Sequence, residues 1–172
     1  MKKIWLKSYP PGVPAEIDLN QFASLGDLFD KSVTRFAGHT AYVNMGKSIS
    51  YAQLDSLSRQ FAGYLQGELK LARGARVALM MPNCLQYPIA MFAVLRAGFT
   101  VVNVNPLYTA RELEHQLRDS GCEAIVIMEN FAHTLAEVME RTSVRHVVVT
   151  GLGDMLGFPK SLLVNLVVRH VK

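Results

Sequence analysis

From residue 75 onward, the sequence alternates between short apolar runs and longer amphipathic stretches. Residues 77–81 are apolar without alternation, which is typical of a strand covered on both faces, and we place the strand at 77–80. Further strands are predicted at residues 100–104, 124–128 and 146–149. Helical stretches separate them, and this rhythm predicts a doubly wound, mostly parallel α/β sheet with flanking helices.

The stretch between the first two strands predicts a helix that is apolar almost all round. It ends near Ala97 and starts between Cys84 and Tyr87, and Pro88 favours the later start because proline is tolerated in a first helical turn. A helix with so little polar surface belongs inside a larger body. Gly98 then ends the helix, and the unit is expected to be a right-handed βαβ crossover.

Two helix starts have clear capping residues. Ser24 precedes one helix, with Asp27 at the capping-box position, and Thr109 precedes another, with Glu112 as its partner. The remaining predicted elements are a hairpin at 40–44 and 48–50 and helices at 25–37, 51–67, 110–120 and 130–141.

The chain divides into three predicted parts. Residues 1–22 are rich in proline and are expected to form an extended arm on the surface. Residues 23–150 form the α/β portion, and residues 151–172 are a glycine-containing loop followed by an apolar helix. Such a helix needs a partner, so we expect a longer protein to continue beyond it.

Composition narrows the class of protein. The chain has 172 residues, of which 50% are hydrophobic and 19% charged, with a net charge of +4. The basic residues are scattered, so a nucleic-acid partner is not expected. The apolar runs are shorter than the roughly 18–20 residues that span a bilayer, so a cytoplasmic location is expected. Cys84 and Cys122 are expected to be inert thiols.

Phosphate-binding motifs are weak. The turn after the first buried strand, Met81-Pro82-Asn83, contains no glycine. Gly151 and Gly153 follow a strand but lack the third glycine, and a flexible exit loop is the favoured interpretation.

Other candidates have plain structural explanations. Asn103, Asn105 and Pro106 follow a strand, where ligands bind in open α/β sheets, although a simple turn is favoured. His133 and His146 have no serine or cysteine nucleophile near them in sequence. One predicted helix carries several side chains of the types that bind metals: Glu112, Glu114, His115 and Asp119. They lack the two histidines four residues apart that a zinc-binding helix has, and a solvated charged face explains them.

A series of short segments covers nearly the whole chain: residues 48–54, 78–83, 95–98, 102–109, 111–113, 119–121 and 130–135, with the opening Trp5-Leu6 and Tyr9-Pro10. Single pieces such as Leu95-Arg96-Ala97-Gly98 are weak signals, whereas the order and spacing of the segments are specific. Together the segments resemble the acyl-adenylate-forming enzymes and, within them, the bacterial long-chain fatty acid–CoA ligases.

This resemblance implies an enzyme that activates a long-chain fatty acid with ATP and Mg²⁺ and transfers the acyl group to coenzyme A. The family's phosphate loop, magnesium ligand, ribose-binding aspartate and C-terminal lysine have no counterpart here, so we assign no catalytic, cofactor-binding or metal-binding residue. We expect truncation rather than divergence, and the 172-residue chain is expected to be inactive and to bind none of these cofactors. A homodimer and peripheral contact with the inner membrane are left open. The alternative is a non-enzymatic α/β binding or assembly module.

Overall fold

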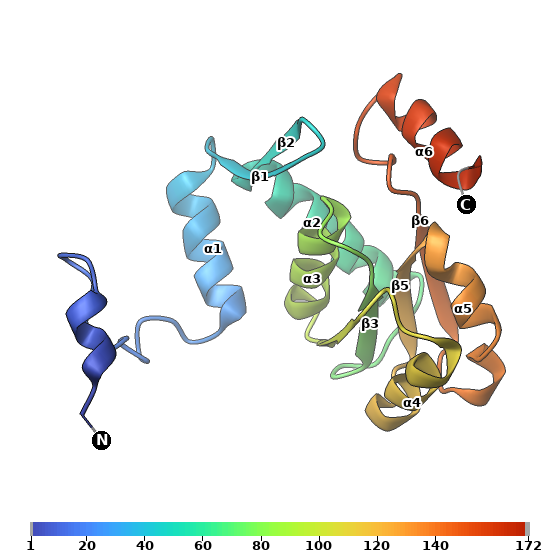
Figure 1. Ribbon diagram of the computed structural model, residues 1–172, viewed down its shortest axis with the longest axis horizontal. Helices are drawn as coiled ribbons and strands as arrows, with labels where there is room; N and C mark the ends of the chain where they lie inside the picture. Colours follow the sequence, from blue (N-terminus) through green and yellow to red (C-terminus); the bar gives the residue numbers. More distant parts are fainter. Residues whose placement is uncertain (1, 171–172) are drawn as a thin grey trace.

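A computed structural model describes residues 2–170 (Figure 1). Its centre is a four-stranded parallel sheet in the order β4-β3-β5-β6. The register places Val77 beside both Val101 and Ala124, and Ala124 beside His146. The strands are β3 (Arg76–Met80), β4 (Thr100–Val104), β5 (Ala124–Met128) and β6 (His146–Thr150).

Helices cover both faces of the sheet. On one face, α2 (Tyr51–Gly67) and α3 (Gln86–Arg96) pack against alternate residues of β3 and β5, including Leu79 and Val126. On the other face, α4 (Ala110–Ser120) and α5 (Ala132–Ala136) cover Ala78 and Ile125. The predicted doubly wound α/β architecture is therefore confirmed.

The predicted βαβ unit is present as β3-α3-β4. Pro88 lies in the first turn of α3, where a missing backbone N–H costs no helical hydrogen bond. Gly98 follows the helix with φ of +79°, a left-handed conformation that glycine adopts without strain. The chain thereby reverses direction and enters β4.

A smaller apolar cluster lies beside the sheet. It joins α1 (Leu25–Phe36), the hairpin of β1 (Thr40–Asn44) and β2 (Lys47–Ser50), and the outer sides of α2 and α3. Phe29 of α1 stacks on Phe92 of α3 with ring centroids 3.9 Å apart. Arg96 donates to Asp55 at 2.7 Å, which fixes α3 against α2.

Two sequence predictions need correction. The predicted helix 130–141 is three short pieces: η2 (Glu129–Phe131), α5 and η3 (Met139–Arg141). Val138 leaves the helical conformation with φ −124° and ψ −11° and is buried, so packing of this branched side chain overrides helix continuation. The arm at 1–22 is not wholly extended either, because Ile4–Ser8 form the 3-10 helix η1.

The last element, α6 (Lys160–His170), follows β6 through a tight loop. The predicted apolar helix is present, although residues 171 and 172 lie outside the described residues. Within residues 2–170, no helix is both long and apolar enough to cross a membrane.

Candidate functional site at the carboxyl edge of the sheet

The carboxyl ends of all four parallel strands meet at one edge. The chain leaves β3 toward α3 on one face and leaves β5 toward α5 on the opposite face, and β3 and β5 are neighbours. Such a reversal marks the crevice where open α/β sheets bind ligands. This edge is therefore the candidate site.

The predicted candidates after β4 make structural contacts. Tyr87 Oη donates to Asn103 Oδ1 at 2.9 Å, which links α3 to β4. Asn105 Oδ1 accepts the backbone N–H of Leu107 at 3.0 Å, forming the turn that the Asn105-Pro106 pair favoured. The two asparagine side chains thus serve different neighbours.

A small pocket of about 240 Å³ lies between the β1–β2 hairpin and the turn after β3. Burial, with Tyr51 and Tyr87 nearby, raises the pKa of Tyr42, and burial also raises the pKa of the Cys84 thiol. The lining can form hydrogen bonds but supplies no charge for a triphosphate. Its polar groups are two phenols, two amides and a neutral thiol, from Tyr42, Tyr87, Asn44, Asn83 and Cys84.

The loop after β6 is tied down, contrary to the flexible exit loop that we expected. Asp154 Oδ2 accepts the Gly151 N–H at 2.7 Å, and Asp154 Oδ1 accepts from Asn165 Nδ2 at 2.8 Å. Asn165 Oδ1 in turn accepts the Gly153 N–H at 2.7 Å. We call this group the α6 clamp: Gly151, Gly153, Asp154 and Asn165.

The glycines of the clamp allow close packing. A Cβ atom on Gly153 would lie 2.5 Å from the Ser161 carbonyl oxygen, and one on Gly151 would lie 2.9 Å from the Asn165 side chain. Burial raises the pKa of Asp154, but hydrogen bonds from Gly151, Asn165 and Thr150 outweigh that effect and hold the pKa below its usual value. These glycines therefore seat a helix and its carboxylate partner.

Each of the acidic side chains at this edge already has a partner. Glu129, immediately after β5, accepts from Arg169 Nε of α6 at 2.9 Å, and Asp154 is held in the clamp. Gln86 Nε2 donates to the Gly151 carbonyl oxygen at 2.8 Å, which fastens α3 to the end of β6. These hydrogen bonds and the ion pair hold the carboxyl edge of the sheet in place, and we call this edge the platform.

An apolar groove of about 450 Å³ lies beside this platform, between α2, the start of α3 and β5–β6. Val148 and Thr150 of β6 contribute to it, and β6 has no further strand outside it in residues 2–170. The apolar members of the lining include Leu57, Phe61, Ile89, Val126, Val148 and Met155.

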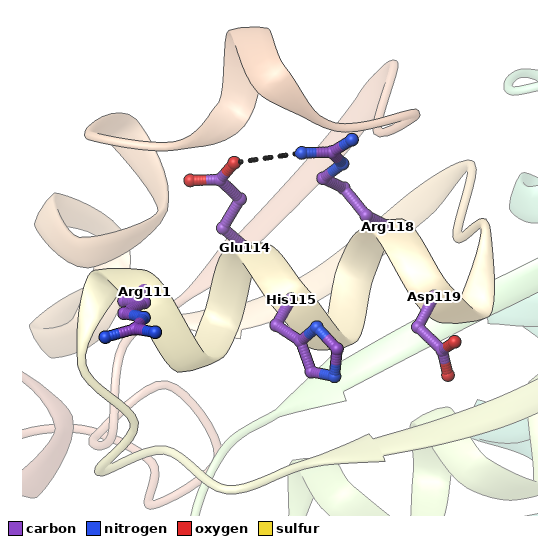
Figure 2. A pocket seen from close by; sticks show the side chains of 5 residues that line it. All are labelled: Arg111, Glu114, His115, Arg118 and Asp119. Carbon is purple, nitrogen blue, oxygen red and sulfur yellow. Dashed lines mark hydrogen bonds and ion pairs between the residues drawn. The ribbon is translucent and has the colours of Figure 1, made fainter.

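The charged face of α4 forms an open hollow of about 500 Å³, shown in Figure 2. Glu114 pairs with Arg141 at 2.9 Å and with Arg118 at 3.5 Å, and the hydrogen bond from Arg141 is the main cause that lowers its pKa. His115 and Asp119 project from the same helix without converging on Glu114 (Figure 2). Glu112 is occupied in the capping box with Thr109.

The remaining predicted candidates are separate from one another. His133 lies in α5, and His146 is the first residue of β6. Both cysteines are buried and free, and burial raises the pKa of the Cys122 thiol, which supports the inert role expected from the sequence. Among residues 2–170, no group of three or more His, Cys, Asp or Glu side chains could hold a metal ion.

The α6 clamp by itself does not fit a triphosphate. A triphosphate needs cationic groups or a row of free backbone N–H donors, and the N–H groups of Gly151 and Gly153 are already taken by Asp154 and Asn165. Sequence reasoning missed the clamp and the Tyr87–Asn103 bond. Asn165, a polar residue inside an apolar helix, was the available signal.

Comparisons with known proteins identify a family and relatives that are longer than this chain. Residues 29–166 match the family described as AMP-binding enzyme. A long-chain-fatty-acid–CoA ligase of Escherichia coli O157:H7 is 57% identical over 172 residues, which are 100% of this chain and 31% of the relative. The corresponding ligase of Bacillus subtilis (strain 168) is 35% identical over 96% of this chain and 29% of the relative.

The fold has a counterpart among solved structures. A long-chain-fatty-acid-CoA ligase from Archaeoglobus fulgidus superposes with a TM-score of 0.67 at 25% identity, over 83% of this chain and 29% of that one. The chain thus spans less than a third of the length of these relatives.

Proposed function

Because the chain belongs to the AMP-binding enzyme family, we propose that it is the N-terminal part of a long-chain fatty acid–CoA ligase. The complete enzyme would join a long-chain fatty acid to ATP, forming an acyl-adenylate and pyrophosphate, and then transfer the acyl group to coenzyme A. The observation that carries this proposal is the 57% identity to such a ligase along the full 172 residues.

In this proposal the chain supplies a scaffold. Adenylation depends on positioning the carboxylate against the α-phosphorus and on neutralising the phosphate charge. The described residues contribute a rigid sheet edge, in which Gln86 and the α6 clamp brace β6. The phosphate-binding groups and the Mg²⁺ ligand would come from the rest of the ligase, so the 172-residue chain alone would form no acyl-adenylate.

The proposal also covers the setting of the enzyme. We assign it to the cytoplasm, where ATP and coenzyme A are available, with peripheral contact to a membrane that holds the fatty acid substrate. No nucleic acid is included among its partners, and a second copy of the protein is included as a homodimer partner.

A chimera tests the proposal. Residues 1–172 of this chain would replace the aligned part of the E. coli relative, of which they span 31%. We expect the chimera to make acyl-CoA from a long-chain fatty acid, ATP and coenzyme A at a rate within about tenfold of the parent, a barrier change of about 1.4 kcal/mol or less. The same chimera carrying Val94→Asp, which disrupts the buried face of α3, is the misfolded control.

A soluble, folded chimera without ligase activity would contradict the proposal. It would favour the alternative, a non-enzymatic α/β module whose likeness to the ligases is confined to the fold.

A further inference from the structure

The first turn of α6 is tied to the side of the sheet where the chain leaves β3. Lys160 donates to the backbone oxygen of Met45 in the β1–β2 turn. Asn44 of the same hairpin donates through Nδ2 to the carbonyl oxygen of Asn83, in the turn after β3, at 3.3 Å. The start of α6 is therefore connected, through the hairpin, to the turn that leads from β3 into α3.

The last turn of α6 is tied to the turn after β5. Arg169 Nε donates to Glu129, immediately after β5, at 2.9 Å. Strands β3 and β5 are neighbours, and the chain leaves them toward opposite faces of the sheet. Helix α6, which lies beyond the end of β6 (Figure 1), thus bridges the two turns that flank the crevice of this sheet.

The orientation of α6 across this crevice depends on directional hydrogen bonds. The helix buries none of its residues from Lys160 to His170, so apolar packing does not set its rotation. The clamp does so instead, because Asn165 donates to Asp154 Oδ1 at 2.8 Å and accepts the Gly153 N–H at 2.7 Å. Each of these hydrogen bonds fixes both a distance and a direction.

We propose that Asp154 and Asn165 are positioning residues for the adenylation step of the ligase. Ligands of open α/β sheets bind outside the carboxyl ends of the strands, at the point where neighbouring crossovers change face. The clamp holds α6 as one wall of that crevice. Neither side chain touches the substrate, and both act through the place they give to the helix.

The positioning role rests on the proposed function, in which a carboxylate must meet the α-phosphorus of ATP. Such an attack is sensitive to placement, and a displacement of about 1 Å can lower its rate by about a hundredfold. A clamp that positions should therefore affect the rate of adenylation more than the KM for ATP or fatty acid.

An exchange of the two clamp side chains separates positioning from a general loss of structure. Asn165→Asp alone places a carboxylate against Asp154, where the amide now donates at 2.8 Å. Asp154→Asn together with Asn165→Asp restores a donor and an acceptor, and the new carboxylate can still accept the Gly153 N–H. Ser161→Ala, one turn earlier on the same side of α6, is the matched control.

The first measurement is amide exchange in the 172-residue chain, which needs no activity. Asn165→Asp should speed exchange across residues 160–170 by at least about tenfold, and the double exchange should restore protection. Ser161→Ala should leave the protection unchanged. Equal protection in Asn165→Asp and the unmodified chain would overturn the proposal, because the clamp would then not hold α6.

The second measurement uses the chimera described above, with a single turnover of acyl-adenylate formation at saturating ATP and fatty acid. We expect Asn165→Asp to lower the rate constant by about 10- to 100-fold with KM values within about threefold, and the double exchange to recover most of the rate. Ser161→Ala should match the unmodified chimera.

Three outcomes in the chimera would overturn the proposal: an unchanged rate constant in Asn165→Asp, a loss that only follows the fraction of unfolded protein, or a raised KM at an unchanged rate constant. An unmodified chimera that is folded but inactive would instead refute the proposed function. In that case the amide exchange still decides whether the clamp sets the position of α6.

Discussion

Helices α3 and α6 have the same length of 11 residues and both contain more apolar than polar residues, yet they lie in opposite environments. Helix α3 buries five residues, whereas α6 buries none of its residues as far as His170. Helix α3 is covered by α2 and by the sheet, and α6 is attached through hydrogen bonds and an ion pair. Apolar composition therefore predicts a helix but does not predict what covers it.

The difference arises from the neighbouring elements. Helix α3 connects two adjacent parallel strands, and a right-handed crossover must lay it against the sheet. Helix α6 follows the edge strand β6, and its polar residues find partners in the preceding loop. The packing of α3 therefore stabilises the fold, whereas the attachment of α6 leaves its apolar side chains exposed.

The largest contrast is expected from placing a charge in each helix. Val94 of α3 is fully buried, so Val94→Asp should lower the free energy of unfolding by about 3–5 kcal/mol, because the carboxylate has no partner there. Val167→Asp on α6, where the side chain is 56% exposed, should change it by less than about 0.5 kcal/mol. Urea denaturation measures both, and similar losses would refute the comparison.

A methyl group added to the loop that packs against the first turn of α6 should have the next largest effect on the free energy of unfolding. Gly153→Ala would place Cβ 2.5 Å from the Ser161 oxygen, and we expect about 2–3 kcal/mol of destabilisation with displacement of α6. Gly63→Ala, in α2 with no atom within 4 Å of the added Cβ, is the matched control and should stabilise the protein by about 0.5–1 kcal/mol. Amide exchange across residues 160–170 would locate the change, and unaltered protection in Gly153→Ala would be evidence against the clamp.

Gly98 should show a smaller, purely conformational effect. The nearest atom to an added Cβ is on the Arg73 side chain at 3.8 Å, so space is available, but φ is +79°. We expect Gly98→Val to cost about 1–3 kcal/mol through backbone strain. Gly38→Val, at a glycine with no atom within 4 Å and no positive φ, provides the comparison. An unchanged denaturation midpoint for Gly98→Val would show that strain does not govern this turn.

The smallest effect is a pH dependence of the clamp. The pKa of Asp154 in the folded chain lies below its ordinary value of 3.8. Its contribution to holding α6 is therefore complete above that value and is lost as the pH falls through the lower folded pKa. NMR shifts of the α6 amides should report this loss below about pH 4. The variant Asp154→Asn should lack the transition, and an identical titration in both proteins would assign it to another group.

Much of the fold could be predicted from local patterns. Uninterrupted apolar runs identified β3 and β5, and capping residues such as Thr109 identified the start of α4. The helix expected at 130–141 was wrong because burial of Val138 depends on tertiary packing that no local pattern contains. Local sequence therefore predicts where elements lie better than how each one ends.

The candidate site was less accessible to sequence reasoning. The hydrogen-bond partners Gly153 and Asn165 of the clamp are 12 positions apart, and Tyr87 and Asn103 come from different elements, so only the folded chain brings them together. The glycines of the clamp were interpreted as a flexible loop because close approach of a later helix leaves no local signature.

We propose that this chain provides the scaffold of a ligase but not its adenylation site. Pyrophosphate release with ATP, Mg²⁺ and a long-chain fatty acid tests it most directly, with the chimera as the positive control. We expect release from the chimera and none from the 172-residue chain. Fatty-acid-dependent release that co-purifies with the chain, and is absent from a mock purification, would contradict the account.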